Sequence, residues 1–106
     1  MIQLDLDLKV KFLRAFGDKT RVQILECIKY DEKTVSQIVD RLDGNQSNIS
    51  QHLACLRGCG IIEGRQEGKY VYYGLRNHQI KELLDTFDHV LSQIQDDVAC
   101  CENHIS

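Results

Sequence analysis

Apolar and polar positions alternate over residues 2–10, a pattern that by itself is typical of a β-strand. From Leu8 onward, however, the apolar positions recur at helical spacing until Gly17, and glycine commonly follows the last turn of a helix. We therefore interpret the first segment as a helix that ends just before Gly17.

Two further helices are predicted by capping residues together with helical spacing of apolar positions. Asp18 is a suitable N-cap for a helix over residues 19–29. Thr34 and Gln37 have the spacing of a capping box, which predicts a short third helix ending near residue 42. The first part of the chain is therefore expected to be entirely helical.

The segment 44–60 predicts a fourth helix with three different faces, because side chains three and four residues apart lie next to each other on a helix. The first face is apolar and must pack on a core; it consists of Ile49, Leu53 and Leu56. The opposite face is small, polar and uncharged; it consists of Ser47, Ser50, Gln51 and Ala54. The third face carries two thiols four residues apart; it consists of Asn48, His52, Cys55 and Cys59.

The Asp43-Gly44 turn joins the third helix to the fourth, and two short helices joined by a glycine-containing turn are typical of a helix-turn-helix motif. In that motif, the amino-terminal residues of the second helix enter the DNA major groove, where short polar side chains bond base edges and phosphates. The candidate DNA-binding residues on this helix are Gln46, Ser47, Asn48, Ser50 and Gln51. The expected partner is double-stranded operator DNA.

Residues 61–73 predict a β-hairpin, because β-branched and aromatic residues lie on both sides of a polar tip that contains two glycines. A hairpin directly after a recognition helix is a wing. Arg65 and Lys69 would then contact phosphates, although exposed hairpin tips commonly carry such residues for solubility alone.

The clearest amphipathic helix spans residues 78–96, with seven apolar positions at helical spacing. So wide an apolar face exceeds what a small domain can cover, which favours burial in a two-fold homodimer. The predicted fold is mainly α with a small β-hairpin: a winged helix-turn-helix in the order α-α-α-α-β-β-α, dimerised through its terminal helices. Residues 1–99 would form this single domain, and residues 100–106 a cysteine-bearing tail.

The composition excludes several classes of protein. A chain of 106 residues without a Pro-rich or Gly/Ser-rich linker is expected to be one domain, and it shows no membrane-length apolar run and no signal peptide. The net charge of −3 hides a basic middle, residues 44–81, and an acidic end, residues 82–106. No nucleophile–base constellation or phosphate-binding loop is present. We expect a cytoplasmic protein that is not an enzyme, has no organic substrate and does not enter a membrane.

Five cysteines are many for a cytoplasmic chain, where disulfides are disfavoured and clustered thiols favour metal binding or redox chemistry. Cys27 lies among apolar residues and is expected to be a small core filler. Cys55 and Cys59 share a helix face, and Cys100 and Cys101 lie in the predicted tail. Thiolates favour soft ions over Mg²⁺ or Ca²⁺.

The chain resembles the ArsR/SmtB family of bacterial metal-responsive repressors over nearly its whole length. The segments that carry the resemblance are Phe16-Gly17-Asp18-Lys19-Thr20-Arg21, Ser47-Asn48-Ile49-Ser50-Gln51-His52-Leu53, Leu56-Arg57 with Gly60, and Tyr72-Tyr73. The resemblance implies a metal-free dimer that occupies a palindromic operator and a metal-bound form that releases it.

Within that family, the chain is most similar to the cadmium/lead sensors. Their pattern implies metal ligands at Cys55, Cys59 and Cys100, with Cys101 as a fourth sulfur that would suit tetrahedral Cd²⁺ or Zn²⁺. A second family site, on the helix before the recognition helix, is absent because residues 36–40 contain no thiol. A third family site, on the last helix, is absent because its four positions are Asn77, Gln79, Val90 and Gln93.

The sequence is also compatible with effectors other than Cd²⁺ or Pb²⁺. Arsenite would also use three thiolates, and the adjacent Cys100-Cys101 pair suits it. Oxidation or persulfidation of a cysteine pair is a further switch. A thiol oxidoreductase is disfavoured, because Cys55 and Cys59 do not have the Cys-x-x-Cys spacing and no strand–helix framework surrounds them.

Overall fold

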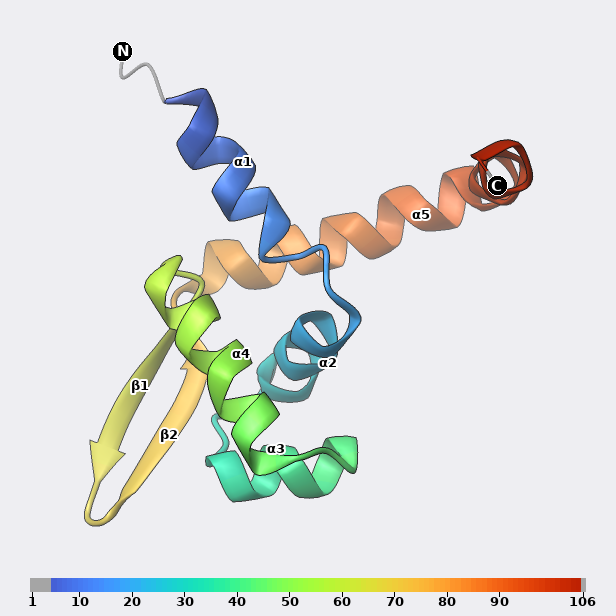
Figure 1. Cartoon of the computed structure of the whole chain (residues 1–106). Helices are drawn as coiled ribbons and strands as arrows, with labels where there is room; N and C mark the ends of the chain where they lie inside the picture. Colours follow the sequence, from blue (N-terminus) through green and yellow to red (C-terminus); the bar gives the residue numbers. More distant parts are fainter. Residues whose placement is uncertain (1–4, 106) are drawn as a thin grey trace.

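The computed structural model describes the backbone of residues 5–105 and the side chains of residues 5–95. Within these residues, five helices and one hairpin follow one another along the chain (Figure 1). They are α1 (Leu6–Arg14), α2 (Lys19–Ile28), α3 (Val35–Leu42), α4 (Gln46–Gly58), β1 (Ile62–Glu67), β2 (Tyr70–Leu75) and α5 (His78–Ile105). The predicted order α-α-α-α-β-β-α of a winged helix-turn-helix is confirmed.

The predicted caps form as expected. The Asp18 carboxylate accepts a hydrogen bond from the Arg21 backbone N–H at 3.1 Å and begins α2. Thr34 and Gln37 make the reciprocal capping box of α3, with distances of 3.3 and 2.9 Å. Each cap pairs backbone groups that a helix end leaves without a partner, so the starts of these helices are determined locally.

The core lies where α2, α3 and α4 pack against each other, with the base of the hairpin closing one side (Figure 1). Its buried residues are Ala15, Ile24, Leu25, Ile28, Ile38, Ile49, Leu53, Leu56, Ile61, Ile62, Ile80 and Leu84. Val22 on α2 is only half-buried, because its side of the helix borders an open groove. Cys27 packs against the core and is also half-buried, in agreement with its predicted role as a filler.

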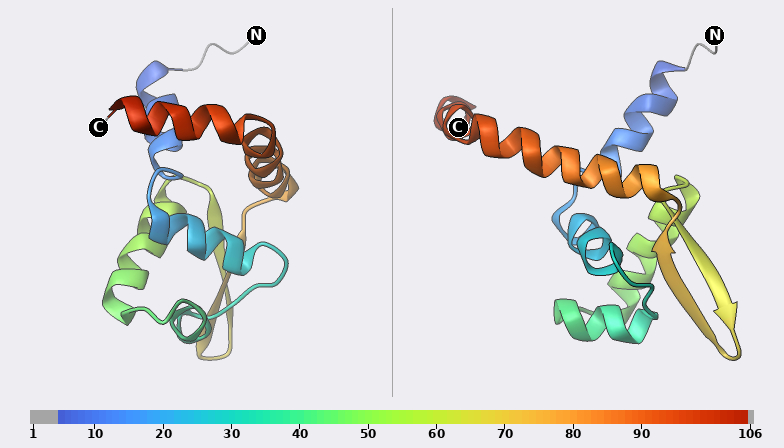
Figure 2. Two further views of the ribbon diagram at one scale, coloured as in Figure 1. Left: turned by 90° about the vertical axis from the view of Figure 1, so that its right-hand side faces the viewer. Right: turned by 180° about the vertical axis from the view of Figure 1, so that it is seen from behind.

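The hairpin extends beside α4 as a wing (Figure 2). β1 and β2 pair antiparallel in a register that runs from Ile62 opposite Leu75 to Glu67 opposite Tyr70. A further bridge joins Lys33, in the α2–α3 loop, to Tyr73, with backbone hydrogen bonds of 3.0 and 2.7 Å in the two directions. The base of the wing is therefore anchored to the helical part of the domain.

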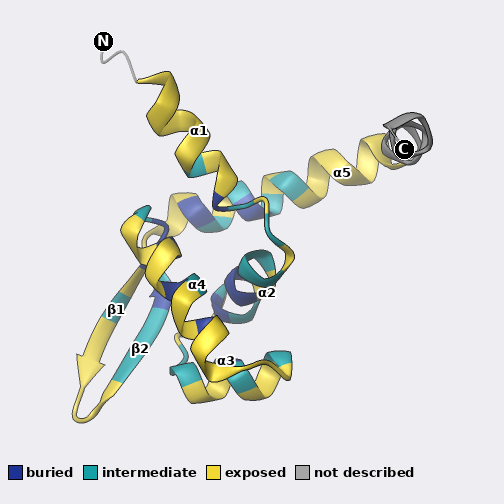
Figure 3. Ribbon diagram, in the orientation of Figure 1, coloured by how far each residue is buried: buried dark blue, intermediate teal, exposed yellow. Residues whose placement is uncertain are grey.

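The terminal helices project from this core (Figures 1 and 3), and several of their apolar side chains remain uncovered. The exposed ones are Leu6, Leu8, Val10 and Leu13 on α1 and Val90, Leu91 and Ile94 on α5. The rings of Phe12, Phe16 and Phe87 pack edge to face at 5.2 and 5.4 Å and connect the two helices. An exposed apolar surface of this kind marks an interface, as predicted for a dimer formed through the terminal helices. No helix in the described part of the chain is long and apolar enough to span a membrane.

The last helix departs from the prediction at its end. The expected helix stopped at residue 96, whereas α5 breaks at Ile94 (φ −117°, ψ 17°) and then resumes as far as Ile105. The segment predicted as a tail is thus helical over residues 100–105. The side chains of Cys100 and Cys101 lie outside the described residues.

A charged pair joins α2 to α5. The Lys29 ammonium, whose side chain is 7% exposed, bonds the Asp85 carboxylate, which also accepts a hydrogen bond from Lys81 at 3.1 Å. These bonds, from Lys29 first and Lys81 second, lower the pKa of Asp85 below its usual range. The carboxylate therefore stabilises the fold above the pKa of an unfolded Asp, about 3.9, and this contribution is lost as pH falls through the lower folded value.

We expect Asp85→Asn to lower the urea midpoint of unfolding at pH 7. The substitution removes the charged partner of the largely buried Lys29 ammonium and leaves it only Glu26, at 3.9 Å. The gap between the two proteins should shrink as pH falls below about 4, where the wild-type carboxylate also becomes neutral. Asp88→Asn, an exposed position on the same helix, is the matched control. A gap that is equal at pH 7 and pH 3 would contradict this assignment.

Candidate DNA interface and thiol pair

α4, the predicted recognition helix, is held in one orientation by its ends and its buried face. The Asn45 side chain accepts a hydrogen bond from the Asn48 backbone N–H at 3.1 Å and begins the helix. Gly60 adopts φ +76° just after the last turn, a conformation that favours glycine. Ile49, Leu53 and Leu56 are at most 2% exposed. Burial of this stripe fixes the rotation of the helix about its axis.

The predicted DNA-binding residues of the recognition helix consequently point outward. Those with exposed side chains are Gln46, Ser47, Asn48, Ser50 and Gln51, all in its amino-terminal half. Within residues 5–95 none of these side chains makes a hydrogen bond to another group. Their donors and acceptors are thus available to base edges and phosphates.

On the wing, the two predicted phosphate contacts differ in their surroundings. Lys69 is exposed at the hairpin tip, with its ammonium 5.6 Å from the centre of the Tyr70 ring. Arg65 is bound to two carboxylates: both oxygens of Glu32 at 2.8–3.2 Å and one oxygen of Glu67 at 2.8 Å. These bonds raise the pKa of Arg65 further, and the Arg65 guanidinium lowers the pKa of Glu32. The partner Glu32 was not anticipated from the sequence.

The thiol pair lies at the other end of the same helix. Cys55 is exposed and Cys59 is half-buried, and the two lie four residues apart, one turn from each other at the end of α4. Burial raises the pKa of the Cys59 thiol, and the neighbouring Cys55 raises it further, against the opposing charges of Lys11 and Arg21. The Cys59 thiol must therefore lose its proton before its sulfur can bind a metal ion.

Two sulfurs are too few for a metal centre of the predicted kind. Among the residues with described side chains, no group of three or more His, Cys, Asp or Glu could hold a metal ion. Cys59 borders a groove of about 380 Å³ between α1 and the end of α4, lined by Leu8, Lys9, Lys11, Phe12 and Gly58. A third donor would have to reach the pair from elsewhere, with this groove as its open approach.

The sequence interpretation missed a contact on the thiol face of α4, between Arg21 and His52. The Arg21 guanidinium donates to the Ala15 and Arg14 carbonyl oxygens, each at 3.0 Å, and lies 3.4 Å from His52 Nδ1. His52 Nε2 lies 4.0 Å from the Asp18 carboxylate. The middle of the recognition helix is thus tied to the α1–α2 junction. Arg21 was noted only as part of a motif, and its partner is 31 residues away in the sequence.

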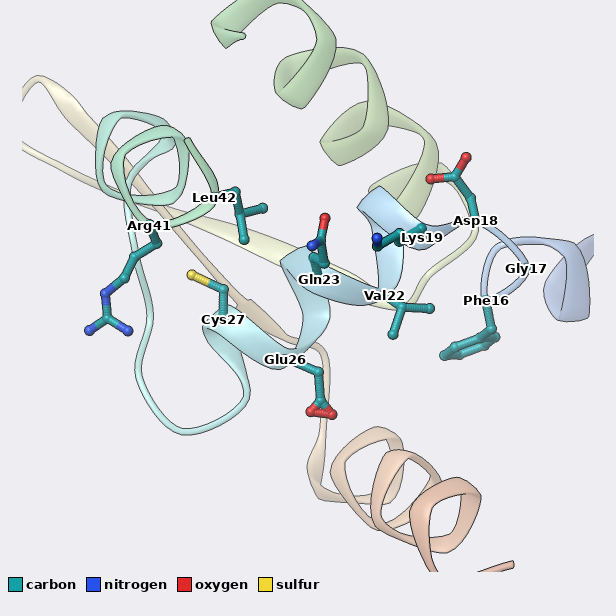
Figure 4. A pocket seen from close by; sticks show the side chains of 10 residues that line it. All are labelled: Phe16, Gly17, Asp18, Lys19, Val22, Gln23, Glu26, Cys27, Arg41 and Leu42. Carbon is teal, nitrogen blue, oxygen red and sulfur yellow. The ribbon is translucent and has the colours of Figure 1, made fainter. Parts of the chain in front are cut away.

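A separate groove lies along α2 and the end of α3 (Figure 4). It is open, encloses about 780 Å³, and is bordered by Phe16, Val22, Cys27 and Leu42 with polar residues at its rim. Cys27 is the one thiol that borders it among the residues with described side chains. The groove is therefore separate from the Cys55–Cys59 pair.

Comparisons with known proteins agree with this architecture. Residues 18–63 match the model of bacterial regulatory proteins of the arsR family. The chain is 32% identical, over 74% of its length, to the "Probable mercury resistance operon repressor" of Streptomyces lividans, and covers 62% of that protein. It is 33% identical, over 82% of its length, to the transcriptional regulator CmtR of Mycobacterium tuberculosis, and covers 74% of it.

Solved structures show the same arrangement. HlyU from Vibrio cholerae superposes with a TM-score of 0.74 at 30% identity, covering 84% of this chain and 97% of that one. A homodimeric winged helix-turn-helix domain of Mb0332 from Mycobacterium bovis has a TM-score of 0.79 at 24% identity, covering 88% and 92%. HlyU is described as a transcriptional activator, so these similar proteins do not all regulate in one direction.

Proposed function

The chain belongs to the arsR family of bacterial regulatory proteins, and from this premise we propose that it is a metal-responsive transcriptional repressor. In this proposal a metal-free homodimer binds operator DNA in the cytoplasm. A thiophilic ion, Cd²⁺ or Pb²⁺, binds cysteine thiolates and releases the dimer, which derepresses a metal efflux or resistance gene. The observation that carries the proposal is the placement of Cys55 and Cys59, four residues apart, on the helix whose exposed amino-terminal half would bind DNA.

The DNA-binding part of the proposal rests on the exposed face of the recognition helix. In a two-fold dimer, the two recognition helices would enter successive major grooves about 34 Å apart. The exposed hydroxyl and amide side chains, from Gln46 to Gln51, would bond base edges, and Lys69 on the wing would supply a phosphate contact.

The metal-binding part of the proposal rests on the chemistry of the cysteine thiolates that would bind the ion. Cys55 and Cys59 would supply two thiolates, Cys100 the third, and Cys101 a fourth where the ion takes four donors. Such sites favour soft ions, which agrees with the name of the Streptomyces lividans relative, a mercury resistance repressor. By linkage, DNA must weaken metal binding by the same factor by which metal weakens DNA binding.

The direction of α5 suggests where the third thiolate comes from. α5 begins near the carboxyl end of α4 and leads away from it toward the far side of the domain (Figures 1 and 2). α5 therefore carries the chain away from the carboxyl end of α4 before the segment that contains Cys100 and Cys101 is reached (Figure 1). We propose that the carboxyl-terminal arm of the second subunit completes each site.

The test is an anaerobic titration of the reduced protein with Cd²⁺ and with Pb²⁺. Thiolate-to-metal absorption would be followed alongside release of an operator duplex selected from a random-sequence library. We expect one ion per subunit and release of DNA for the wild type and for Cys27→Ser, the control thiol on α2. Cys55→Ser should abolish the release. DNA that stays bound at metal saturation would refute the proposal.

A second candidate is a repressor of the same fold that responds to arsenite or to thiol oxidation or persulfidation. It is favoured by the proximity of Cys55 to Cys59 and by the similarity to HlyU, one of whose structures is described as reduced. Operator release by an oxidant or persulfide donor without metal, reversed by a dithiol reductant, would support a thiol switch. Release by arsenite at lower concentrations than Cd²⁺ would support an arsenite sensor.

A further inference from the structure

Arg65 differs from every other basic residue of the wing in the number of bonds that it makes. Its Nε lies 3.1 and 3.2 Å from the two Glu32 oxygens, and its Nη2 lies 2.8 Å from the nearer one. Its Nη1 lies 2.8 Å from Glu67. The guanidinium carbon is 5.3 Å from the centre of the Tyr72 ring. All three nitrogens are thus engaged with carboxylates, and one face of the group is directed at an aromatic ring.

Glu32 is held in place by the backbone around it. A Cβ atom on Gly74, which is buried in β2, would lie 3.2 Å from Glu32 Cγ, so glycine at this position leaves room for the glutamate to cross the strand. The next residue, Lys33, makes the two backbone hydrogen bonds to Tyr73. The carboxylate therefore approaches Arg65 from a loop that is already bound to the wing.

We propose that Arg65 positions the wing and does not bind DNA phosphate. In this arrangement Glu32 and Glu67 hold the Arg65 guanidinium, and the pair fastens the middle of β1 to the α2–α3 loop. Charge-assisted, two-pronged bonds between arginine and carboxylate have a defined geometry, which suits a group that sets the angle of the hairpin. The wing's phosphate contact then falls to Lys69, for which the described residues show no carboxylate partner.

Glu32 also limits the affinity of the wing for DNA. Glu32 and Glu67 occupy three of the five N–H donors of the Arg65 guanidinium and neutralise its charge, so a phosphate would have to compete with both carboxylates for it. Removal of the Glu32 charge would free the guanidinium for phosphate. The proposal depends on DNA binding, which the family establishes, and not on the response to metal.

The salt dependence of binding distinguishes a residue that binds phosphate from one that positions the wing. The affinity falls as salt rises, and removing one bond to phosphate reduces the magnitude of the slope of log affinity against log salt by about 0.9. The probe is a mixed-sequence DNA duplex of about 30 base pairs, long enough for two half-sites one helical turn apart. With two copies per dimer, Lys69→Gln should reduce the magnitude of the slope by about 2, Arg65→Gln should reduce it by clearly less, and Glu32→Gln should increase it. A slope that falls as far in Arg65→Gln as in Lys69→Gln would overturn the proposal.

Amide hydrogen exchange supplies the second readout. The Tyr73 N–H, bonded to the Lys33 carbonyl, should exchange faster in both Arg65→Gln and Glu32→Gln, and at the wild-type rate in Lys69→Gln. Wild-type exchange in Arg65→Gln and Glu32→Gln would show that the pair does not position the wing. Because Glu32→Gln alters the pair and leaves Arg65 in place, it tests the proposal even if Arg65→Gln fails to fold.

Discussion

Replacement of Leu53 by alanine should lower the free energy of unfolding by about 2–5 kcal/mol, the range for a buried leucine that leaves a cavity. Leu53 is 2% exposed and lies in the middle of the apolar stripe of the recognition helix, between Ile49 and Leu56. The same packing holds the DNA-binding face in its orientation. For a domain of this size the decrease is a large fraction of the total stability, so operator binding should also fail on mild heating.

The matched control is Gln51→Ala on the opposite face of the same helix, which is exposed. It should change the free energy of unfolding by no more than about 0.5 kcal/mol. Its operator affinity should nevertheless fall, because a side chain that bonds a base or phosphate is removed. Urea unfolding and DNA binding measured on both variants check the two expectations. Equal stability of the two variants would mean that the apolar stripe does not anchor the helix.

Mixed dimers should show whether each metal site spans two subunits. We expect neither Cys55→Ser/Cys59→Ser nor Cys100→Ser/Cys101→Ser to bind Cd²⁺ tightly as a homodimer, since each leaves no complete thiolate set. In a mixed dimer of the two, the intact helix pair of one subunit can meet the intact arm of the other. One full site per dimer should therefore reappear, and with it the thiolate-to-metal absorption.

An arm that closes on its own subunit predicts the opposite result, because no single chain of the mixed dimer has both halves of a site. The experiment needs differently tagged chains that are unfolded together, refolded and separated by tandem purification. Cys27→Ser introduced into both chains removes the remaining thiol of the domain core and should not alter the outcome. Absence of Cd²⁺ binding in the mixed dimer would contradict a site shared between subunits.

Both experiments concern one helix for which two functions are proposed. Its buried stripe sets which residues meet DNA, and its carboxyl-terminal half carries the thiols, so metal bound at Cys55 and Cys59 would be next to the elements that hold the helix. Arg21 is one of these, with bonds to the end of α1 and a contact to His52. The proposed response therefore needs no long path between the metal and the DNA-binding face.

The sequence by itself determined the elements and the faces of the recognition helix. Helical spacing of Ile49, Leu53 and Leu56 was enough to orient Ser50 and Cys55, because a helix with one buried stripe has a single rotation that buries it. The caps at Asp18, Thr34 and Asn45, like the hairpin, depend on neighbours a few residues away, and such local signals can be recognised without a structure.

Only the tertiary structure decided which distant side chains meet. Glu32 and Arg65 are 33 residues apart and pair because the Lys33–Tyr73 bridge brings a loop onto the wing. No sequence pattern around Glu32 or Arg65 indicates that the two residues pair, so Arg65 was interpreted from its charge alone. The direction in which α5 leaves the core likewise follows from tertiary packing, which buries its residues Ile80 and Leu84. Local preferences specify that a helix forms, whereas long-range contacts specify where it points.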